Sequence, residues 1–169
     1  IGLGYVGLPL AEAFSTHLKV IGYDINEQRI KELRNKNNKN DNIYLEFTTE
    51  PTKTKKADIV LICVPTPVTK SKEPDLSYVK SAVEIVGKNL KKGAIVILES
   101  TVYPGVTEEI VKPILEKESR LKCGIDFKIG YSPERINPSD KAHTLAKITK
   151  IVAGMDEKTT EVLAKLYGL

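Results

Sequence analysis

The sequence opens with three closely spaced glycines, Gly2, Gly4 and Gly7, which form a G-x-G-x-x-G pattern. The pattern runs directly into residues 8–16, a largely apolar stretch that we interpret as a helix. Each glycine has a physical reason in a dinucleotide-binding loop: a tight turn, close approach of the backbone to a pyrophosphate, and close packing of the helix on the sheet. Free amides at the start of the helix would hold the phosphates. Alone, the pattern is weak evidence, because a glycine turn without a ligand has the same residues.

An acidic residue at the end of the next apolar segment strengthens this interpretation. Residues 19–23 are typical of a strand, and Asp24 closes it. In dinucleotide-binding domains, an acid about 20 residues beyond the first glycine accepts hydrogen bonds from the adenosine ribose. A carboxylate there also repels a 2′-phosphate. The two signals together predict a dinucleotide site that takes NAD as its cofactor.

The composition is that of a globular domain. The 169 residues suffice for one domain, with 41% hydrophobic and 28% charged residues. The net charge is +4, but the lysines alternate with glutamates along the chain, and the densest cluster, residues 53–56, has no interleaved aromatic residue. We therefore expect no nucleic-acid binding. No apolar run reaches the roughly 18 residues of a membrane span, so we expect no membrane segment and a cytoplasmic location.

The two cysteines do not form a recognisable metal or redox motif. Cys63 and Cys123 lack C-x-x-C spacing and have no histidine pair nearby, so no metal site is predicted. Cys63 lies in an apolar run, where a buried, unreactive thiol is expected. Neither cysteine is expected to face the cofactor.

Apolar strands and amphipathic helices alternate along the chain. Strands are predicted at residues 59–64, 94–98, 127–131 and 148–154, and helices at 26–35, 75–90 and 107–119 and from residue 156 onward. Residues 36–42 are expected to be loop, residues 43–49 to be either helix or strand, and Pro113 to kink its helix or divide it in two. Strand–helix alternation predicts an α/β fold with a doubly wound parallel sheet of the Rossmann type.

The ends of the chain indicate a piece of a longer protein. A G-x-G-x-x-G loop needs a strand ahead of it, yet only Ile1 precedes Gly2. The final helix also runs to the last residue. We therefore interpret residues 1–169 as one NAD-binding domain, cut at both ends, of an enzyme whose other domains lie elsewhere.

Polar or proline-containing segments follow every predicted parallel strand. They are residues 2–7, Asp24, 64–67, 99–101 and 131–135, whereas the opposite strand ends carry plain connectors. Ligands of open parallel sheets bind at the carboxyl ends of the strands. The sequence therefore predicts a site along this edge.

Four of these segments carry a specific resemblance. Residues 2–9 (GLGYVGLP), 64–67 (VPTP), 99–105 (ESTVYPG) and 131–135 (YSPER), in this order and spacing, resemble the N-terminal domain of the UDP-glucose/GDP-mannose dehydrogenase family. The likeness covers essentially the whole chain. Residues 136–143 are similar to the branch that acts on UDP-N-acetylhexosamines.

The resemblance implies a two-step oxidation of the C6 alcohol of a UDP-sugar to a carboxylate. The family uses two NAD+ and a catalytic cysteine of a later domain, and neither Cys63 nor Cys123 matches that residue. The chain alone should therefore bind NAD without turnover. A homo-oligomer is expected to form through the other domains.

The resemblance also assigns site residues. Thr101 matches a threonine beside the reacting centre, although a strand-end hydroxyl that caps the backbone is an alternative. Arg29 could instead face solvent. The cofactor-binding residues are predicted to be Gly2, Gly4, Tyr5, Val6, Gly7, Asp24, Arg29, Val64, Pro65, Thr66 and Thr101.

The substrate side is predicted around Glu134. It matches a catalytic glutamate that could act as a general base, with an ion pair to Arg135 as the alternative role. Glu134, Arg135 and Asn137 are the predicted substrate-binding residues. Pro138 replaces the second glutamate of the UDP-glucose members, which puts any role of that glutamate in doubt, and His143 is expected to face solvent.

Two rival functions remain open from the sequence. One is another hydroxyl-oxidising NAD dehydrogenase of similar architecture, which the residue 100–105 segment argues against. The other is a non-catalytic NAD-binding module, since a chain with no nucleophile needs no chemistry.

Overall fold

The fold is known from a computed structural model, which describes residues 1–40, 42–69, 72–133 and 149–169, with the side chains of residues 38–40 outside this description. Helices and strands alternate along these ranges, as the sequence predicts. The strands are β1 (Val20–Tyr23), β2 (Leu45–Thr48), β3 (Ile59–Ile62), β4 (Ile95–Leu98), β5 (Lys128–Tyr131) and β6 (Ala153–Gly154). The helices are α1 (Gly7–Phe14), α2 (Glu27–Asn40), the 3₁₀ helix η1 (Pro51–Lys56), α3 (Ser77–Lys88), the π turn η2 (Thr107–Val111), α4 (Lys112–Ser119) and α5 (Glu157–Tyr167).

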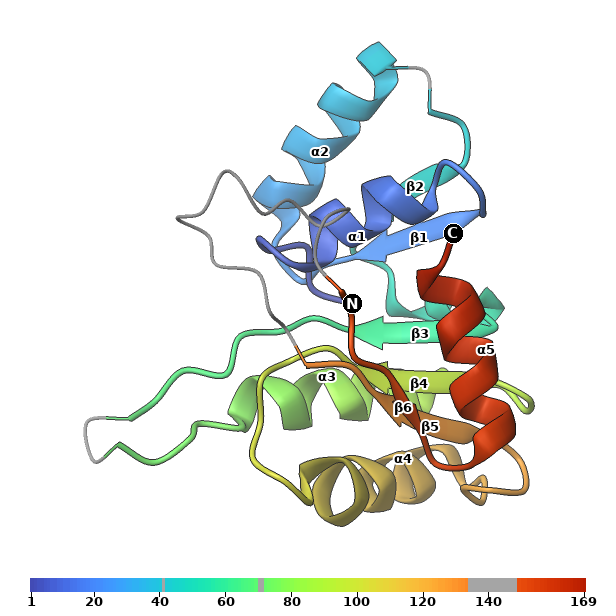
Figure 1. Ribbon diagram of the computed structural model, residues 1–169. Helices are drawn as coiled ribbons and strands as arrows, with labels where there is room; N and C mark the ends of the chain where they lie inside the picture. The colour runs from blue at the N-terminus through green and yellow to red at the C-terminus, as the bar shows by residue number, and fades with distance from the viewer. Residues whose placement is uncertain (41, 70–71, 134–148) are drawn as a thin grey trace.

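The first two residues join two groups of strands into one sheet. β1 pairs with β2 and β3 pairs with β4, both in parallel. The amide of Gly2 donates to Tyr23 O at the end of β1 (2.9 Å), and the amide of Cys63 donates to Ile1 O (2.8 Å). Residues 1 and 2 therefore lie between β1 and β3, and the N-terminus is drawn between them (Figure 1). The resulting order, β2-β1-β3-β4-β5-β6 with the start of the chain in the middle, is that of a Rossmann-type sheet.

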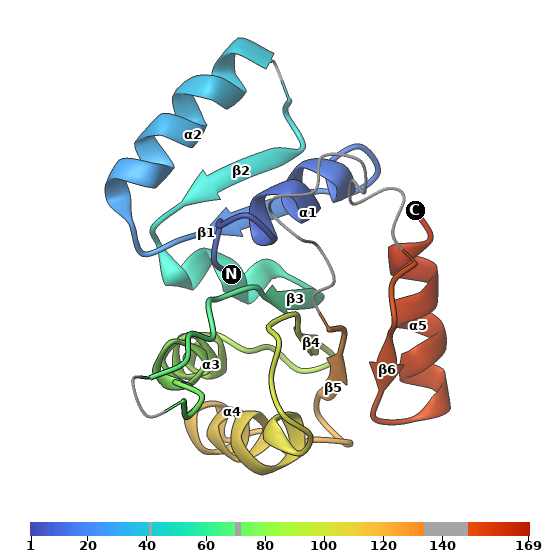
Figure 2. The same cartoon turned by 60° about the vertical axis from the view of Figure 1, so that its left-hand side comes forward.

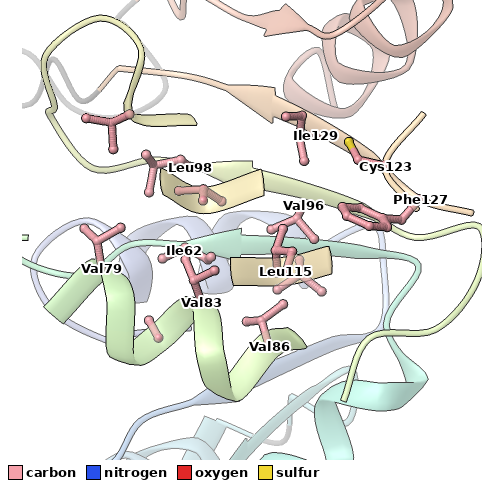
Figure 3. Packing of buried hydrophobic residues seen from close by; sticks show 14 of the residues in the cluster. Ile62, Val79, Val83, Val86, Val96, Leu98, Leu115, Cys123, Phe127 and Ile129 are labelled. Carbon is pink, nitrogen blue, oxygen red and sulfur yellow. The ribbon is translucent and has the colours of Figure 1, made fainter. Parts of the chain in front are cut away.

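Helices cover both faces of the β3–β6 sheet. On one face, Val79, Val83 and Val86 of α3 pack with Leu115 of α4 against strand residues such as Ile62, Val96, Leu98 and Ile129 (Figure 3). On the other face, Ile97 packs against Leu163 and Leu166 of α5. Figure 2 shows α3 and α4 on the side of the sheet away from α5. The alternation of β4 side chains between these two clusters is the geometry of a buried strand.

The last strand corrects the prediction of an all-parallel sheet. β6 pairs antiparallel to β5, with Gly130 opposite Gly154. It is also shorter than the predicted residues 148–154, and residue 148 lies outside the described ranges. A strand parallel to β5 would need a crossover connection that brings the chain back to the start of β5. Here β6 runs in the opposite direction alongside β5, and α5 follows only after β6.

The predicted loop at residues 36–42 was also wrong in part, because α2 continues to Asn40. The Asn37 side-chain amide donates to the carbonyls of Asn42 (3.1 Å) and Leu45 (2.8 Å), which holds the last turns of α2 against β2. These side-chain bonds to the segment that follows favour the helix where the polar sequence does not. The undecided residues 43–49 contain β2.

Other expectations concern Pro113, the cysteines and membrane segments. The predicted disruption of the helix at Pro113 takes the form of a π turn: η2 passes directly into α4, whose second residue is Pro113, and the backbone stays helical at Val111 and Lys112, so the two elements form one continuous helix rather than two. Cys63 and Cys123 are both buried, and neither forms a disulfide within the described residues. Within the described ranges, no helix combines the length and the apolar character needed to cross a membrane.

Candidate functional site

The three loop glycines meet three different surroundings. Gly2 has a φ of +83°, and a β-carbon there would lie 2.9 Å from Cys63 O. At Gly7 a β-carbon would lie 1.9 Å from Gly2 O, so only glycine lets α1 begin this close to the loop. At Gly4 an added β-carbon would meet nothing within 4 Å. The fold therefore requires glycine at Gly2 and Gly7, while Gly4 leaves space that the protein itself does not fill.

The space beside Gly4 belongs to a cavity of about 410 Å³ at the carboxyl ends of the strands. The start of α1 borders it, since Gly4, Tyr5 and Val6 line the cavity directly ahead of that helix. Val6, at the N-cap, provides no side-chain capping bond. Backbone amides at a helix start that lack a side-chain cap suit an anionic group.

The carboxylate of Asp24 fastens the loop to the end of β1. One oxygen accepts from the Leu3 amide (2.8 Å) and the other from the Asn26 amide (2.9 Å). A carboxylate has about four acceptor positions, so about two remain for a ligand. Asp24 also lines the cavity. It therefore both shapes the loop and presents acceptors to the cavity.

Arg29 lies behind the loop. Its guanidinium donates to Leu3 O (3.4 Å), and its amide is capped by the side chain of Asn26 (3.0 Å). It is half-buried rather than facing solvent, and it is not among the residues that line the cavity. The position of Arg29 indicates that its side chain supports the glycine loop at Leu3.

The ends of β3 and β4 are tied together on the opposite side of the cavity. The hydroxyl of Thr66 donates to Thr101 O (2.7 Å), and the hydroxyl of Ser100 donates to Val64 O (2.6 Å). Thr101 is exposed and lines the cavity. Its hydroxyl makes no hydrogen bond within the described part of the chain, so the alternative role of a backbone cap is not seen there.

Most of the predicted cofactor residues thus surround one cavity. Gly7 and Arg29 do not line this cavity. Of two neighbouring residues that do, the side chain of Val6 is buried, with 7% exposure, whereas that of Tyr5 is 61% exposed. Glu134, Arg135, Asn137, Pro138 and His143 lie outside the described residues. The predicted residues that line the cavity are Gly2, Gly4, Tyr5, Val6, Asp24, Val64, Pro65, Thr66 and Thr101.

One face of α3 completes the cavity wall, which the sequence analysis missed. Tyr78, Ser81, Ala82 and Ile85 line the cavity. Their helical spacing was available in the sequence, but it is masked by the stronger apolar stripe of Val79, Val83 and Val86 that faces the core.

The position of Cys63 contradicts another prediction, that neither cysteine faces the cofactor edge. Cys63 directly follows β3 and lines the cavity, although it is only 9% exposed beneath the glycine loop. The prediction that neither cysteine faces the cofactor edge was therefore wrong for Cys63.

Comparison with known proteins identifies the domain. Residues 1–168 match the family model described as the UDP-glucose/GDP-mannose dehydrogenase family, NAD binding domain. The chain belongs to this family. It is 51% identical to Protein CapL of Staphylococcus aureus, over 99% of this chain and 42% of that protein. It is 46% identical to a UDP-N-acetyl-D-glucosamine 6-dehydrogenase of Pseudomonas aeruginosa, over 99% of this chain and 42% of that protein.

Solved structures of family members agree with the fold. The UDP-N-acetyl-D-mannosamine dehydrogenase of Pyrococcus horikoshii superposes with a TM-score of 0.89 at 34% identity, covering 99% of this chain and 43% of that one. A GDP-mannose dehydrogenase of Pseudomonas aeruginosa gives a TM-score of 0.86 at 28% identity, with the same coverage. The predicted family and Rossmann-type fold are thereby confirmed. The chain spans less than half the length of the curated relatives it matches.

The cavity fits NAD, the cofactor of this family's domain. The open space at Gly4 admits a group against the backbone where the start of α1 suits phosphates. The acceptors of Asp24 lie at the end of β1, where the adenosine ribose is held in such domains. Thr101 borders the cavity from the β4 side. Anionic and hydroxyl-binding groups therefore line a single cavity.

Proposed function

We propose that the protein carrying this chain oxidises the C6 alcohol of a UDP-sugar, a UDP-N-acetylhexosamine, to the uronic acid in two NAD-dependent steps. The observation that carries the proposal is the shared cavity, in which Asp24 and the glycine loop face the same space as Thr101. Two similar relatives, a UDP-N-acetyl-D-glucosamine 6-dehydrogenase and a UDP-N-acetyl-D-mannosamine dehydrogenase, support the substrate class.

The residues of this chain bind and orient the cofactor in this proposal. Backbone amides from Gly4 to Val6 hold the pyrophosphate, and Asp24 accepts from the adenosine ribose. Gly2, Gly7 and Arg29 shape the loop, while Val64, Pro65 and Thr66 form the wall at the end of β3. Bound NAD+ supplies the hydride acceptor for each step.

Thr101 acts at the reacting end of the cavity. Its hydroxyl, which the Thr66–Thr101 bond places at the strand end, orients a water molecule or a developing oxyanion of the substrate. Glu134 serves as the general base of the hydrolytic step, with Arg135 and Asn137 on the substrate. The overall reaction turns one primary alcohol, two NAD+ and one water into one carboxylate, two NADH and three protons.

Turnover by the intact protein tests the proposal. The protein is mixed with NAD+ and, separately, UDP-N-acetylglucosamine, UDP-N-acetylgalactosamine, UDP-N-acetylmannosamine and UDP-glucose, and NADH and uronic acid are measured. Two NADH per uronic acid from an N-acetylhexosamine are expected. NAD binding without NADH formation from any of these sugars would instead support the non-catalytic module, and preference for UDP-glucose would refute the substrate class.

The proposal includes the assembly and location of the intact protein. We expect a homo-oligomer formed through domains outside this chain, measured by light scattering. We also expect a cytoplasmic location, measured by cell fractionation. Cys63 and Cys123 form no disulfide within the described residues, which suits a reducing compartment.

A further inference from the structure

A buried ionic cluster lies beside the predicted reaction site. The carboxylate of Glu99, with 0% exposure, accepts from the Lys150 ammonium at 2.7 Å and from the hydroxyl of Tyr167. The Lys150 side chain is only 11% exposed, and its ammonium lies 5.5 Å from the centre of the Tyr167 ring. We call Glu99, Lys150 and Tyr167 the Glu99 cluster.

Stability alone does not account for the cluster. Removing two charges from water costs free energy that their mutual attraction repays only in part, and well-packed apolar residues of similar volume are often as stable or more so. On the α5 side the neighbours of the cluster are apolar: Ile97, two residues before Glu99 on the same strand face, packs against Leu163 and Leu166. An apolar side chain at position 99 would continue that packing.

Glu99 directly follows β4, two residues ahead of Thr101. Its amide donates to Ile62 O (2.9 Å), the final bond between β4 and β3. Ser100 and Thr101 follow, and Glu99, Ser100 and Thr101 all line the cavity. On the β3 side, the strand end is held by the hydroxyls of Ser100 and Thr66. On the α5 side, the Glu99 cluster holds it.

The cluster joins parts of the chain that are far apart in sequence. Lys150 precedes β6, and Tyr167 is the last residue of α5. The Tyr167 ring also meets the Phe14 ring edge-on, with 5.7 Å between their centres, at the end of α1 opposite the glycine loop. The end of β4 is therefore connected to the helix that begins the NAD site and to the helix that covers the sheet.

We propose that Glu99 is a positioning residue for Thr101: its buried ion pair with Lys150 and its bond with Tyr167 hold the end of β4 so that Thr101 faces the cavity. This role rests on the proposed function, because it acts on the reaction through Thr101. Bonds on both sides of a strand end restrict its motion more than bonds on one side. Small displacements of a positioned group reduce rates steeply, by up to about 10²-fold for 1 Å.

The test separates positioning from stability. In the intact protein, the apolar triple variant Glu99→Leu/Lys150→Met/Tyr167→Phe is compared with the unmodified protein. We expect an unfolding temperature and an NAD affinity close to those of the unmodified protein. Turnover should fall by about 10²-fold. Amide hydrogen exchange in the peptide spanning residues 97–103 should become faster.

An ion pair at the N-terminal end of α5, between β5 and the N-cap of the helix, provides the control. Lys128 pairs with Asp156 (2.8 Å) at the other end of α5, away from the β4 end. Lys128→Met should lower stability but leave turnover and exchange in residues 97–103 unchanged. If the triple variant does not fold, Tyr167→Phe alone carries the exchange measurement, because it removes one hydrogen bond to Glu99 and leaves the ion pair with Lys150 intact. Faster exchange in residues 97–103 is again expected.

Two outcomes would overturn the role of Glu99. One is a stable triple variant with normal turnover and normal exchange in residues 97–103, which would make the cluster purely structural. The other is an equal loss of turnover in Lys128→Met. If the unmodified protein oxidises no UDP-sugar, the proposed function fails, but the exchange measurement still decides whether the cluster holds the strand end.

Discussion

Gly4 and Gly7 lie in the same loop but are needed for different reasons. An added methyl at Gly4 meets no protein atom within 4 Å, whereas at Gly7 it would collide with Gly2 O at 1.9 Å. We therefore expect Gly4→Ala to fold normally and to weaken NAD binding by about tenfold or more, or about 1.4 kcal/mol. Gly7→Ala should destabilise folding by about 1–3 kcal/mol or more. Thermal unfolding and NAD titration of both variants measure this.

A result with the two effects exchanged would contradict this assignment. If Gly4→Ala bound NAD as tightly as the unmodified chain, the open space beside Gly4 would not be where the cofactor approaches. Unchanged unfolding of Gly7→Ala would mean that α1 can shift away from the loop at little cost.

Asp24 should set the choice of cofactor. Its carboxylate retains about two acceptor positions for the ribose hydroxyls and repels a 2′-phosphate. Asp24→Ala should weaken NAD binding by roughly 1.5–3 kcal/mol, which is about tenfold to over a hundredfold. Calorimetry with NAD and NADP measures it. Asp24→Asn removes the charge and keeps one of the two side-chain oxygens, so it can accept from only one of the Leu3 and Asn26 amides, and it should reduce the preference for NAD.

Equal binding of NAD and NADP by the unmodified chain would refute this role. A loss of thermal stability in Asp24→Ala as large as its loss of NAD affinity would show that the bonds to Leu3 and Asn26, rather than ribose recognition, dominate the effect.

At the level of elements, α5 is held to the sheet through its first turn. Asp156 caps the helix by accepting from the amide and the hydroxyl of Thr159, and it pairs with Lys128 of β5. The hydrogen bond from Lys128, followed by those from Thr159, holds the pKa of the Asp156 carboxyl well below its usual value. Stability from Asp156 is therefore fully present above the unfolded-state pKa of about 3.9 and is lost as pH falls through the lower pKa of the folded state.

Urea unfolding of the unmodified chain and Asp156→Asn across pH tests this linkage. The difference in unfolding free energy between them should stay constant above about pH 5 and shrink below about pH 4. Lys128→Met should reduce the difference at neutral pH, because it removes the largest cause of the lowered pKa. A difference that is independent of pH down to the acid transition would show that the cap and the ion pair do not form in solution.

At the scale of the whole molecule, the chain should bind NAD without catalysing its reduction. Cys63 borders the cavity, but it is 9% exposed and packed under the loop at Gly7, so it is poorly placed to attack a substrate. The family resemblance assigns the nucleophile to another domain. The isolated chain with NAD+ and each UDP-sugar should therefore give no NADH, while calorimetry detects NAD binding. NADH formation that disappears in Cys63→Ser would reverse this assignment.

The sequence by itself determined the features that depend on neighbouring residues. The glycine loop, the acid closing β1 and the apolar runs of β3 and β4 are local patterns with few structural solutions, so the fold class followed from them. The family and the cofactor residues were predicted from the resemblance of four short motifs, and nine of those eleven residues line the cavity. The residue range 134–148, which includes the predicted substrate side, lies outside the described structure.

Only the tertiary structure decided features that depend on long-range packing. The direction of β6 and the use of one face of α3 as a cavity wall follow from which surfaces meet. The helical spacing of α3 is visible in the sequence, but it does not say which face borders the cavity. Glu99 is the clearest example, because its partners Lys150 and Tyr167 are 51 and 68 residues away in the sequence. The role of a charged residue at the end of an apolar strand becomes apparent only when the fold brings the three side chains together. A buried carboxylate is stable only where such partners converge, and their convergence is a property of the packed molecule.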